Sequence, residues 1–235
     1  MKLAVFDIDG TLTVGDGLGT RCFFAAFDEV FGSGIVDRRL ETYAESTDGG
    51  IVLEAAVRAL GREPAQAELE DFKAAYLGRL EREIARASRA YRPVPGADRI
   101  LPLLASQPGW HVAIATGNWR RAASLKLECA RISRPPVAAC SEDGTSRSEV
   151  LAAAVVSATV VAGGREFERV VYIGDQPWDL RAASRVGAAF LGIGSDARGR
   201  RLEQEGARVI ENYLDAELVL SLLETAAASP AATVT

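Results

Sequence analysis

The sequence of 235 residues predicts an α/β fold, in which a parallel β-sheet is covered by helices on both faces. The first observation is that short, almost continuous apolar runs alternate with helical patterns, as at residues 3–6, 112–115 and 170–173. Such runs are typical of strands that are buried on both faces. The second is that residues 16–90 contain helical patterns and no strand pattern. This predicts a small all-helical domain inserted directly after the first strand.

The order of the elements follows from the spacing of apolar residues. In the inserted segment this spacing predicts helices near 23–31, 52–60 and 69–84, with a short helix at 36–45. After Pro93, strands and helices alternate, which predicts the remaining sheet and its covering helices. Strands are expected at 112–115, 137–140, 170–173 and 189–193, and helices near 101–105, 119–131, 147–162, 178–186, 199–206 and 215–226.

Composition excludes several classes of function. The hydrophobic fraction of 48% suffices for a buried core, and a net charge of −5 without a basic stripe disfavours nucleic-acid binding. The most apolar stretch, 151–162, is too short to cross a bilayer. The three cysteines lack metal-ligand spacing and are expected to be reduced thiols. We therefore expect a cytoplasmic monomer or homodimer without membrane or nucleic-acid partners, with a disordered small and polar tail at 227–235.

Two carboxylates at the end of the first strand form the most informative motif, which reads DIDGTL at residues 7–12. Side chains alternate along a strand, so Asp7 and Asp9 start on the same side. Two acids aimed at one spot call for a cation, and oxygen-only ligands favour magnesium. A simple Asx turn would need only one of the two carboxylates. The pair therefore favours a functional site.

The second expected strand ends in Thr116-Gly117-Asn118. Thr116 offers a hydroxyl and Gly117 a close backbone approach, which together suit the binding of an oxyanion. Asn118 is expected to cap the following helix, with a role in the site as the alternative.

A third strand ends in an acid, Asp175, with a second acid, Asp179, four residues later. Asp179 could belong to the same site or could stabilise the start of the following helix. In open parallel sheets the ligand site lies beyond the carboxyl ends of the strands. Asp7, Thr116 and Asp175 each stand at such an end, so we expect them to converge. Arg147, at the start of another helix, adds a permanent positive charge.

Together these motifs resemble the haloacid dehalogenase superfamily of phosphotransferases. The resemblance covers nearly the whole chain and rests on four motifs in order: DxDGTL, a threonine that ends a strand, a basic residue that begins a helix, and GDxxxD. The layout is similar to phosphoglycolate-phosphatase-like members with a helical cap. The resemblance implies a three-layer, Rossmann-like catalytic core formed by residues 1–15 and 91–226, with a helical cap domain at 16–90.

The resemblance also implies a Mg²⁺-dependent phosphohydrolase that acts on a small phosphorylated metabolite through an aspartyl phosphate. Asp7 would be the nucleophile, and Asp9 the general acid and base. Magnesium would be held by the Asp7 carboxylate, the Asp9 backbone carbonyl and Asp175. The transferred phosphate would be held by three residues, Thr116, Gly117 and Arg147.

Arg147 departs from the family pattern, in which the third motif usually carries lysine. Arginine can hold phosphate through two hydrogen bonds and keeps its charge, so the chemistry permits this replacement. Lys126 is the competing candidate. It lies about ten residues into a helix that begins at the site, or roughly 15 Å along the helix axis. We therefore expect Lys126 at the surface or at an edge.

Two residues of the inserted segment are further candidates for contact with the substrate. Asp48 lies in the loop 46–50 and could face the substrate or, like Thr47, cap the following helix. Arg21, at the head of the first inserted helix, is a similar candidate. A lid that excludes water would also exclude a protein surface, which suggests a small substrate.

Alternative activities remain within the superfamily. Asp9 favours phosphate chemistry, because the dehalogenases of this superfamily do not need an acid at that position. The single lysine of the inserted segment, Lys73, lies in a charged helix, which disfavours phosphonate cleavage through a Schiff base. A sugar phosphomutase shares the first half-reaction and stays as the alternative. A catalytically silent binding protein would be expected to lack at least one motif residue.

Overall fold

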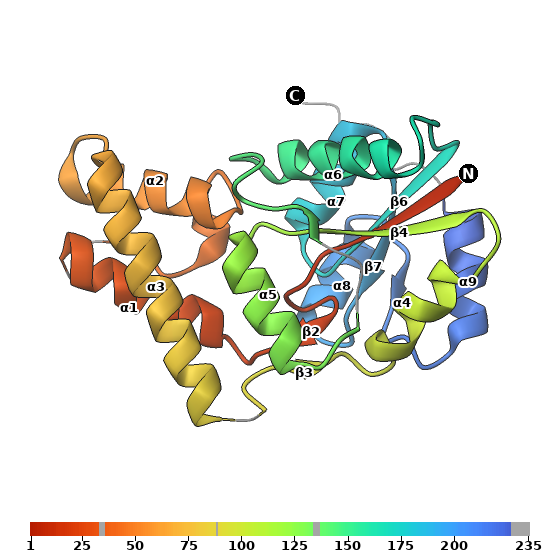
Figure 1. Cartoon of the computed structure of the whole chain (residues 1–235), viewed down its shortest axis with the longest axis horizontal. Helices are drawn as coiled ribbons and strands as arrows, with labels where there is room; N and C mark the ends of the chain where they lie inside the picture. The colour runs from red at the N-terminus through yellow and green to blue at the C-terminus, as the bar shows by residue number, and fades with distance from the viewer. Residues whose placement is uncertain (33–35, 88, 134–136, 227–235) are drawn as a thin grey trace.

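A computed structural model describes residues 1–32, 36–87, 89–133 and 137–226; the tail expected at 227–235 lies outside these ranges. Its six-stranded sheet has the order β5-β4-β1-β6-β7-β8, and all neighbouring strands are parallel. The expected α/β fold is therefore confirmed (Figure 1). The strands are β1 (Lys2–Phe6), β4 (Trp110–Ala115), β5 (Val137–Ala139), β6 (Arg169–Gly174), β7 (Ala189–Ile193) and β8 (Val209–Ile210).

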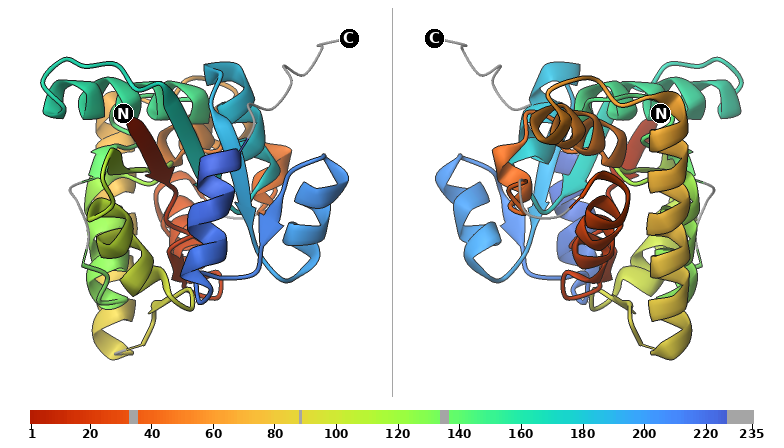
Figure 2. Two further views of the ribbon diagram at one scale, coloured as in Figure 1. Left: turned by 90° about the vertical axis from the view of Figure 1, so that its right-hand side faces the viewer. Right: turned by 90° about the vertical axis from the view of Figure 1, so that its left-hand side faces the viewer.

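Helices cover both faces of this sheet. Side chains alternate along each strand, so each face presents apolar side chains that pack against its own set of helices. In β1, Leu3 and Val5 join the cluster formed with α6 (Arg147–Val161) and α7 (Pro177–Val186), whereas Phe6 joins the cluster with helices of the opposite face. The helices of that opposite face are α4 (Ala97–Ala105), α5 (Arg120–Cys129) and α9 (Ala216–Thr225). α8 (Ala197–Gln204) follows β7. Figure 2 shows this layered arrangement from two sides.

Three helices follow the first strand and form the helical cap: α1 (Leu18–Phe31), α2 (Asp48–Leu60) and α3 (Gln66–Arg86). α1 and α3 pack side by side through aromatic rings, with Phe23 and Phe72 at a centroid distance of 4.9 Å. The chain enters this segment through β2 (Thr13–Val14) and leaves it through β3 (Arg92–Pro93), which pair antiparallel. These two-residue strands were not expected from the sequence. α5 lies at the junction of the cap and the sheet (Figure 1).

The helix expected at 36–45 is wrong. This stretch holds only a single 3₁₀ turn at Leu40–Thr42. Local side-chain hydrogen bonds compete with a helix here. The Asp37 carboxylate accepts hydrogen bonds from the backbone N–H and Nε of Arg39, and the Tyr43 hydroxyl donates to the Asp37 carbonyl oxygen at 2.5 Å.

Within the described ranges, no helix has the length and apolar character that a bilayer span requires. All three cysteines are free thiols, and Cys22 and Cys140 are buried.

Candidate active site

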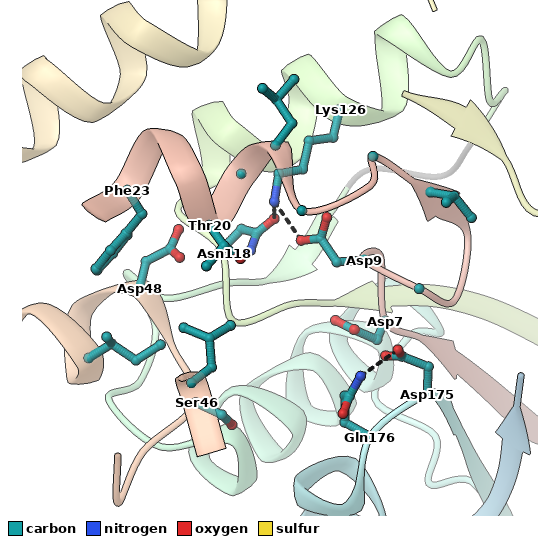
Figure 3. A pocket seen from close by; sticks show the side chains of 18 of the residues that line it. Asp7, Asp9, Thr20, Phe23, Ser46, Asp48, Asn118, Lys126, Asp175 and Gln176 are labelled. Carbon is teal, nitrogen blue, oxygen red and sulfur yellow. Dashed lines mark hydrogen bonds and ion pairs between the residues drawn. The ribbon is translucent and has the colours of Figure 1, made fainter. Parts of the chain in front are cut away.

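Polar side chains meet at the carboxyl edge of the sheet. Asp7 follows β1, Thr116 follows β4 and Asp175 follows β6. The register places the ends of these three strands level, and each of the three side chains belongs to a residue at most 3% exposed. A cavity of about 340 Å³ lies between this edge and the cap, and Asp7 and Asp175 line it (Figure 3).

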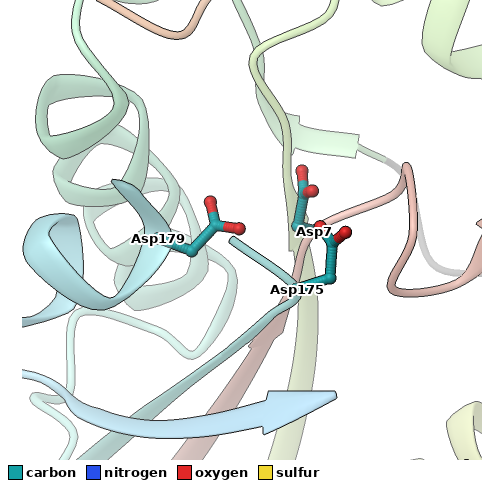
Figure 4. A group of neighbouring side chains, drawn as sticks. All are labelled: Asp7, Asp175 and Asp179. Atoms are coloured by element: carbon teal, nitrogen blue, oxygen red, sulfur yellow. The ribbon is translucent and has the colours of Figure 1, made fainter. Parts of the chain in front are cut away.

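Three buried carboxylates form an acidic group beneath the cavity. Oxygen atoms of Asp7, Asp175 and Asp179 all lie within 4.8 Å of one another (Figure 4). Burial raises the pKa of Asp7 to about 7, and it also raises the pKa of Asp175 and of Asp179. Asp179 has two functions, because its Oδ2 also accepts a hydrogen bond from the Gln176 backbone N–H at the start of α7.

The acidic group fits a divalent cation. Asp175 Oδ1 is buried and has no hydrogen-bond partner within the described ranges. Such an orphaned oxygen is costly unless something else satisfies it. Gly10 has a φ of +78°, and a Cβ atom there would lie 2.1 Å from Asp175 Oδ2, so only glycine allows the first motif to approach this carboxylate. An all-oxygen set of this kind suits Mg²⁺.

Asp9 lines the same cavity and pairs with Lys126. The two charged atoms, Lys126 Nζ and Asp9 Oδ2, are 2.5 Å apart (Figure 3). The expectation that Lys126 is a surface or edge residue is wrong, because this residue is only 2% exposed and lines the cavity. Burial alone would lower the pKa of Lys126, but the Asp9 carboxylate and other neighbours raise it well above its ordinary value. α5 runs alongside the cavity rather than away from it, so the long side chain returns to the site.

Asn118 supports this ion pair. Its Oδ1 accepts a second hydrogen bond from Lys126 Nζ at 2.7 Å, and the residue lines the cavity. The expectation that Asn118 caps the following helix is wrong, because α5 begins one residue later than that requires, with Trp119 at its N-cap. The side chain of Asn118 is thus available to fix Lys126.

Arg147 is buried between two acids. Its Nη1 donates to Asp7 Oδ1 at 3.0 Å, and its Nε lies 3.4 Å from Asp179 Oδ1. Both Arg147 and Lys126 therefore approach the site, each beside one aspartate of the first motif. Ser146 and Glu149 form a capping box that begins α6 and positions Arg147 in its first turn.

Thr116 and Gly117 lie at this edge but are not among the residues that line the cavity. The Thr116 hydroxyl accepts a hydrogen bond from the Asn118 backbone N–H at 3.2 Å. A Cβ atom on Gly117 would lie 2.4 Å from the Ser46 carbonyl oxygen and 3.1 Å from the Arg147 guanidinium carbon. Gly117 thus permits the cap loop to approach Arg147 closely.

The start of α2 contacts the core directly. Asp48 donates its backbone N–H to the Gly117 carbonyl at 2.6 Å, and its Oδ2 accepts from the Trp119 backbone N–H at 2.9 Å. Thr47 is the helix cap, as expected, because its hydroxyl oxygen accepts from the Gly50 N–H. Asp48 itself lines the cavity, and burial raises its pKa to about 6.

Arg21 is not part of this arrangement. It is exposed, and its guanidinium donates to the Asp16 carbonyl oxygen at 2.6 Å. The sequence reasoning missed two other residues that contact Asp175 Oδ2 and line the cavity: Gln176 donates to it at 2.7 Å, and Arg198 at 3.1 Å. A signal for Arg198 existed, because β7 also ends at this edge and Arg198 follows it by five residues.

Comparison with protein families agrees with this geometry. A family model described as haloacid dehalogenase-like hydrolase matches residues 1–187, which include all four motifs. The chain belongs to the haloacid dehalogenase-like hydrolases. Comparison with curated proteins gives no match.

Solved structures share the fold of this haloacid dehalogenase-like hydrolase. A hydrolase from Pseudomonas syringae is 24% identical, with 97% of this chain and 100% of that chain covered and a TM-score of 0.71. CbbY from Rhodobacter sphaeroides, in complex with phosphate, is 23% identical over 91% of this chain and 95% of that one, with a TM-score of 0.66. A predicted phosphoglycolate phosphatase from Haemophilus somnus is 15% identical, with coverages of 94% and 98% and a TM-score of 0.58.

Proposed function

We propose that the chain is a cytoplasmic, Mg²⁺-dependent phosphohydrolase that acts on a small phosphorylated metabolite through an aspartyl phosphate on Asp7. The observation that carries the proposal is the position of Asp7. Its carboxylate belongs to the buried acidic group, is hydrogen-bonded by Arg147 and lines the cavity. A nucleophile needs this combination of a fixed orientation, a nearby cation and access to the substrate.

In the first step, an oxygen of Asp7 attacks phosphorus and the bond to the leaving oxygen breaks. The carboxylic acid of Asp9 gives its proton to that leaving oxygen, so an alcohol departs and an aspartyl phosphate remains. In the second step, the Asp9 carboxylate takes a proton from water as the water oxygen attacks phosphorus. The bond from phosphorus to Asp7 then breaks, which regenerates the carboxylate and releases inorganic phosphate.

Asp7, Asp175 and the backbone carbonyl of Asp9 would hold Mg²⁺, with Asp179 beside them. When bound, the ion would offset the repulsion between the Asp7 carboxylate and the phosphate and help to orient the phosphoryl group. Arg147 would bind the transferred phosphate. Thr116 and Gly117, to which the resemblance gives the same role, lie at this edge of the sheet but do not line the cavity.

Lys126 would position Asp9. Its ammonium group lies 2.5 Å from the Asp9 carboxylate and is held in turn by Asn118. The Asp9 side chain is 43% exposed, so without such a partner it would sample several orientations. A fixed Asp9 serves both proton transfers, because each requires a hydrogen-bond distance to the reacting oxygen.

The test is phosphate release from an aryl phosphate and from a panel of small phosphate monoesters, with Mg²⁺ or with EDTA. We expect release that requires Mg²⁺ and that Asp7→Asn abolishes, whereas Asp71→Asn, at an exposed position on α3, keeps it. Release that persists in Asp7→Asn would contradict the proposal. Activity that appears only after a sugar bisphosphate is added would favour the phosphomutase instead.

A further inference from the structure

The side of the cavity that the cap forms carries apolar and hydroxyl-bearing side chains and one acid. Among the described residues of 18–86 that line the cavity, none is a lysine or an arginine, and the one charged residue is Asp48. We call this side the cap wall; it consists of the apolar residues Leu18, Phe23, Leu40 and Ile51, the hydroxyl-bearing residues Thr20, Ser46 and Tyr76, Gly19, and one acid, Asp48. An anion held against these uncharged side chains and a carboxylate would lose hydration without gaining a counter-charge.

The cations that line the cavity all come from the core, and each is already paired with a carboxylate of the catalytic machinery. Lys126 contacts Asp9, Arg147 contacts Asp7, and Arg198 contacts Asp175. The three distances are 2.5, 3.0 and 3.1 Å, in that order. Each of these cations is therefore already held by an aspartate of the core. Within the part of the chain that the structure describes, no cation is left to bind a second anionic group at the cap wall.

Asp48 is built to accept a hydrogen bond from a ligand. The residue is 8% exposed, and its position is fixed by the backbone contact with Gly117. The hydrogen bond from the Trp119 N–H occupies Oδ2, which leaves Oδ1 for a donor. In Figure 3 the carboxylate of Asp48 points toward the side of the cavity where Asn118 and Lys126 lie.

A second polar group of the cavity lacks a partner. The Tyr91 hydroxyl is buried and has no hydrogen-bond partner in the described ranges, although the residue lines the cavity and is 2% exposed. Gly19 keeps the space beside it open, because a Cβ atom there would lie 3.1 Å from the Tyr91 oxygen and 3.1 Å from Lys126 Nζ. A hydroxyl-bearing ligand would satisfy both Tyr91 and Asp48.

We infer that the substrate is the phosphate monoester of a small alcohol without an anionic group, which presents a hydroxyl or ammonium donor to Asp48. This inference rests on the proposed function and narrows its substrate class. It excludes leaving groups that carry a carboxylate or a second phosphate, because such groups would face Asp48 and the apolar residues of the cap wall without a free cation. The cavity of about 340 Å³ has the size of a small-molecule site.

The test compares phosphate monoesters that differ only at the far end of the leaving group: ethyl, 2-hydroxyethyl, 2-aminoethyl and carboxymethyl phosphate, with their three-carbon homologues. We expect kcat/KM for the best hydroxyl or ammonium ester to exceed that for the carboxylate ester of the same length by at least about tenfold. The hydroxyl and ammonium esters distinguish the two donor chemistries. Ethyl phosphate gives the kcat/KM of a substrate without a polar end group.

Asp48→Asn is the informative variant, because the amide has nearly the same shape and no charge. We expect it to raise kcat/KM for the carboxylate esters relative to the ammonium esters by at least about tenfold. Asp71→Asn is the control and should leave these ratios unchanged. If Asp48 had only a structural role, the substitution would lower kcat/KM for every ester by the same factor. That result would overturn the inference.

The remaining outcomes separate the inference from the proposed function. One outcome would overturn the inference alone. In it, phosphate monoesters whose leaving group carries a carboxylate or a second phosphate are hydrolysed as well as the hydroxyl-bearing ones, in a reaction that Asp7→Asn abolishes. The absence of Asp7-dependent release from every ester, including the aryl phosphate, would contradict the proposed function and the inference with it.

Discussion

The Nζ atom of Lys126 lies 2.5 Å from Oδ2 of Asp9, and the lysine side chain is only 3% exposed whereas that of Asp9 is 43% exposed. One partner is therefore fixed within the protein, and the other faces the cavity. This asymmetry suits a residue that orients an acid without taking part in the proton transfer itself. Asn118 completes the arrangement by holding the same ammonium group.

The first prediction concerns Lys126→Met, which keeps the length of the side chain and removes the charge. We expect kcat to fall by about ten- to a hundredfold, because Asp9 loses its fixed orientation, an effect at the low end of what acid–base catalysis contributes. KM should change much less, because Lys126 does not hold the phosphate. Steady-state kinetics would measure both quantities.

The matched control is Lys73→Met. Lys73 pairs with Glu142 at 2.7 Å and lies over the Trp119 ring, but it does not line the cavity. Equal kinetic losses in the two variants would contradict a specific role for Lys126.

The second prediction concerns Gly10→Ala. We expect at least about a tenfold loss of Mg²⁺ affinity, because the new Cβ atom would lie 2.1 Å from Asp175 Oδ2 and displace that carboxylate. Gly61→Ala is the control, since Gly61 also has a positive φ, of +67°, with no atom within 4 Å of a Cβ atom. Both variants pay for backbone strain, about 1–2 kcal/mol, but only the first should change a Mg²⁺ titration of activity. Identical titrations would rule out the steric argument.

The third prediction concerns pH and the metal-free protein. Burial raises the pKa of Asp7 to about 7 from 3.8, so between these values the folded chain retains a proton that the unfolded chain has lost. The contribution of Asp7 to the free energy of unfolding must then fall as the pH rises through this interval. Mg²⁺ held by Asp7 would replace that proton, so stabilisation by Mg²⁺ should grow from pH 5 to pH 7.

Thermal unfolding from pH 5 to 8, with EDTA or with Mg²⁺, would measure this dependence. Asp7→Asn serves as the reference, because it lacks the titrating group and retains the other carboxylates. A wild-type protein in EDTA that gains stability relative to Asp7→Asn as the pH rises from 5 to 7 would refute the prediction.

The fourth prediction concerns Arg147→Met. Without the guanidinium, the carboxylates of Asp7 and Asp179 would be left buried and unpaired, and breaking a buried pair in this way costs about 3–5 kcal/mol. We expect a loss of this size in EDTA, partly reversed by Mg²⁺, and a smaller loss for Arg147→Lys. Urea unfolding would measure it. Arg86→Met is the control, because Arg86 forms an exposed ion pair with Glu83, worth about 0–1 kcal/mol. A loss in Arg147→Met no larger than in this control would contradict the role of Arg147.

The convergence of Asp7, Thr116 and Asp175 was predictable because it depends on strand ends alone. Each residue directly follows a buried apolar run, and the carboxyl ends of neighbouring parallel strands share one edge. The same reasoning applies to the cap, whose long apolar stripes specify α1, α2 and α3 with their residues near the expected bounds.

Lys126 was not predictable in this way. Its distance along the helix was overestimated, because α5 begins at Arg120 and Lys126 lies only about 9 Å along the axis from there. The direction of the helix axis relative to the cavity also depends on packing against the cap. A lysine side chain is also long enough to return to a site that the backbone has left. The prediction of a helix at 36–45 failed because local hydrogen bonds of the Asp37 carboxylate and the Tyr43 hydroxyl stabilise a different backbone conformation.

The most direct test of the central claim is to look for the phosphoryl group on Asp7 itself. The Asp9→Asn variant would be mixed with an aryl phosphate, whose leaving group departs without a proton from Asp9, and Mg²⁺. The mixture would be quenched in acid within milliseconds to seconds and digested for mass spectrometry. We predict that the peptide containing Asp7 gains the mass of one phosphoryl group and that Asp7→Asn shows no such gain. Phosphate release by the wild-type protein with no phosphorylated peptide at any time, or with the phosphoryl group on another residue, would contradict the account.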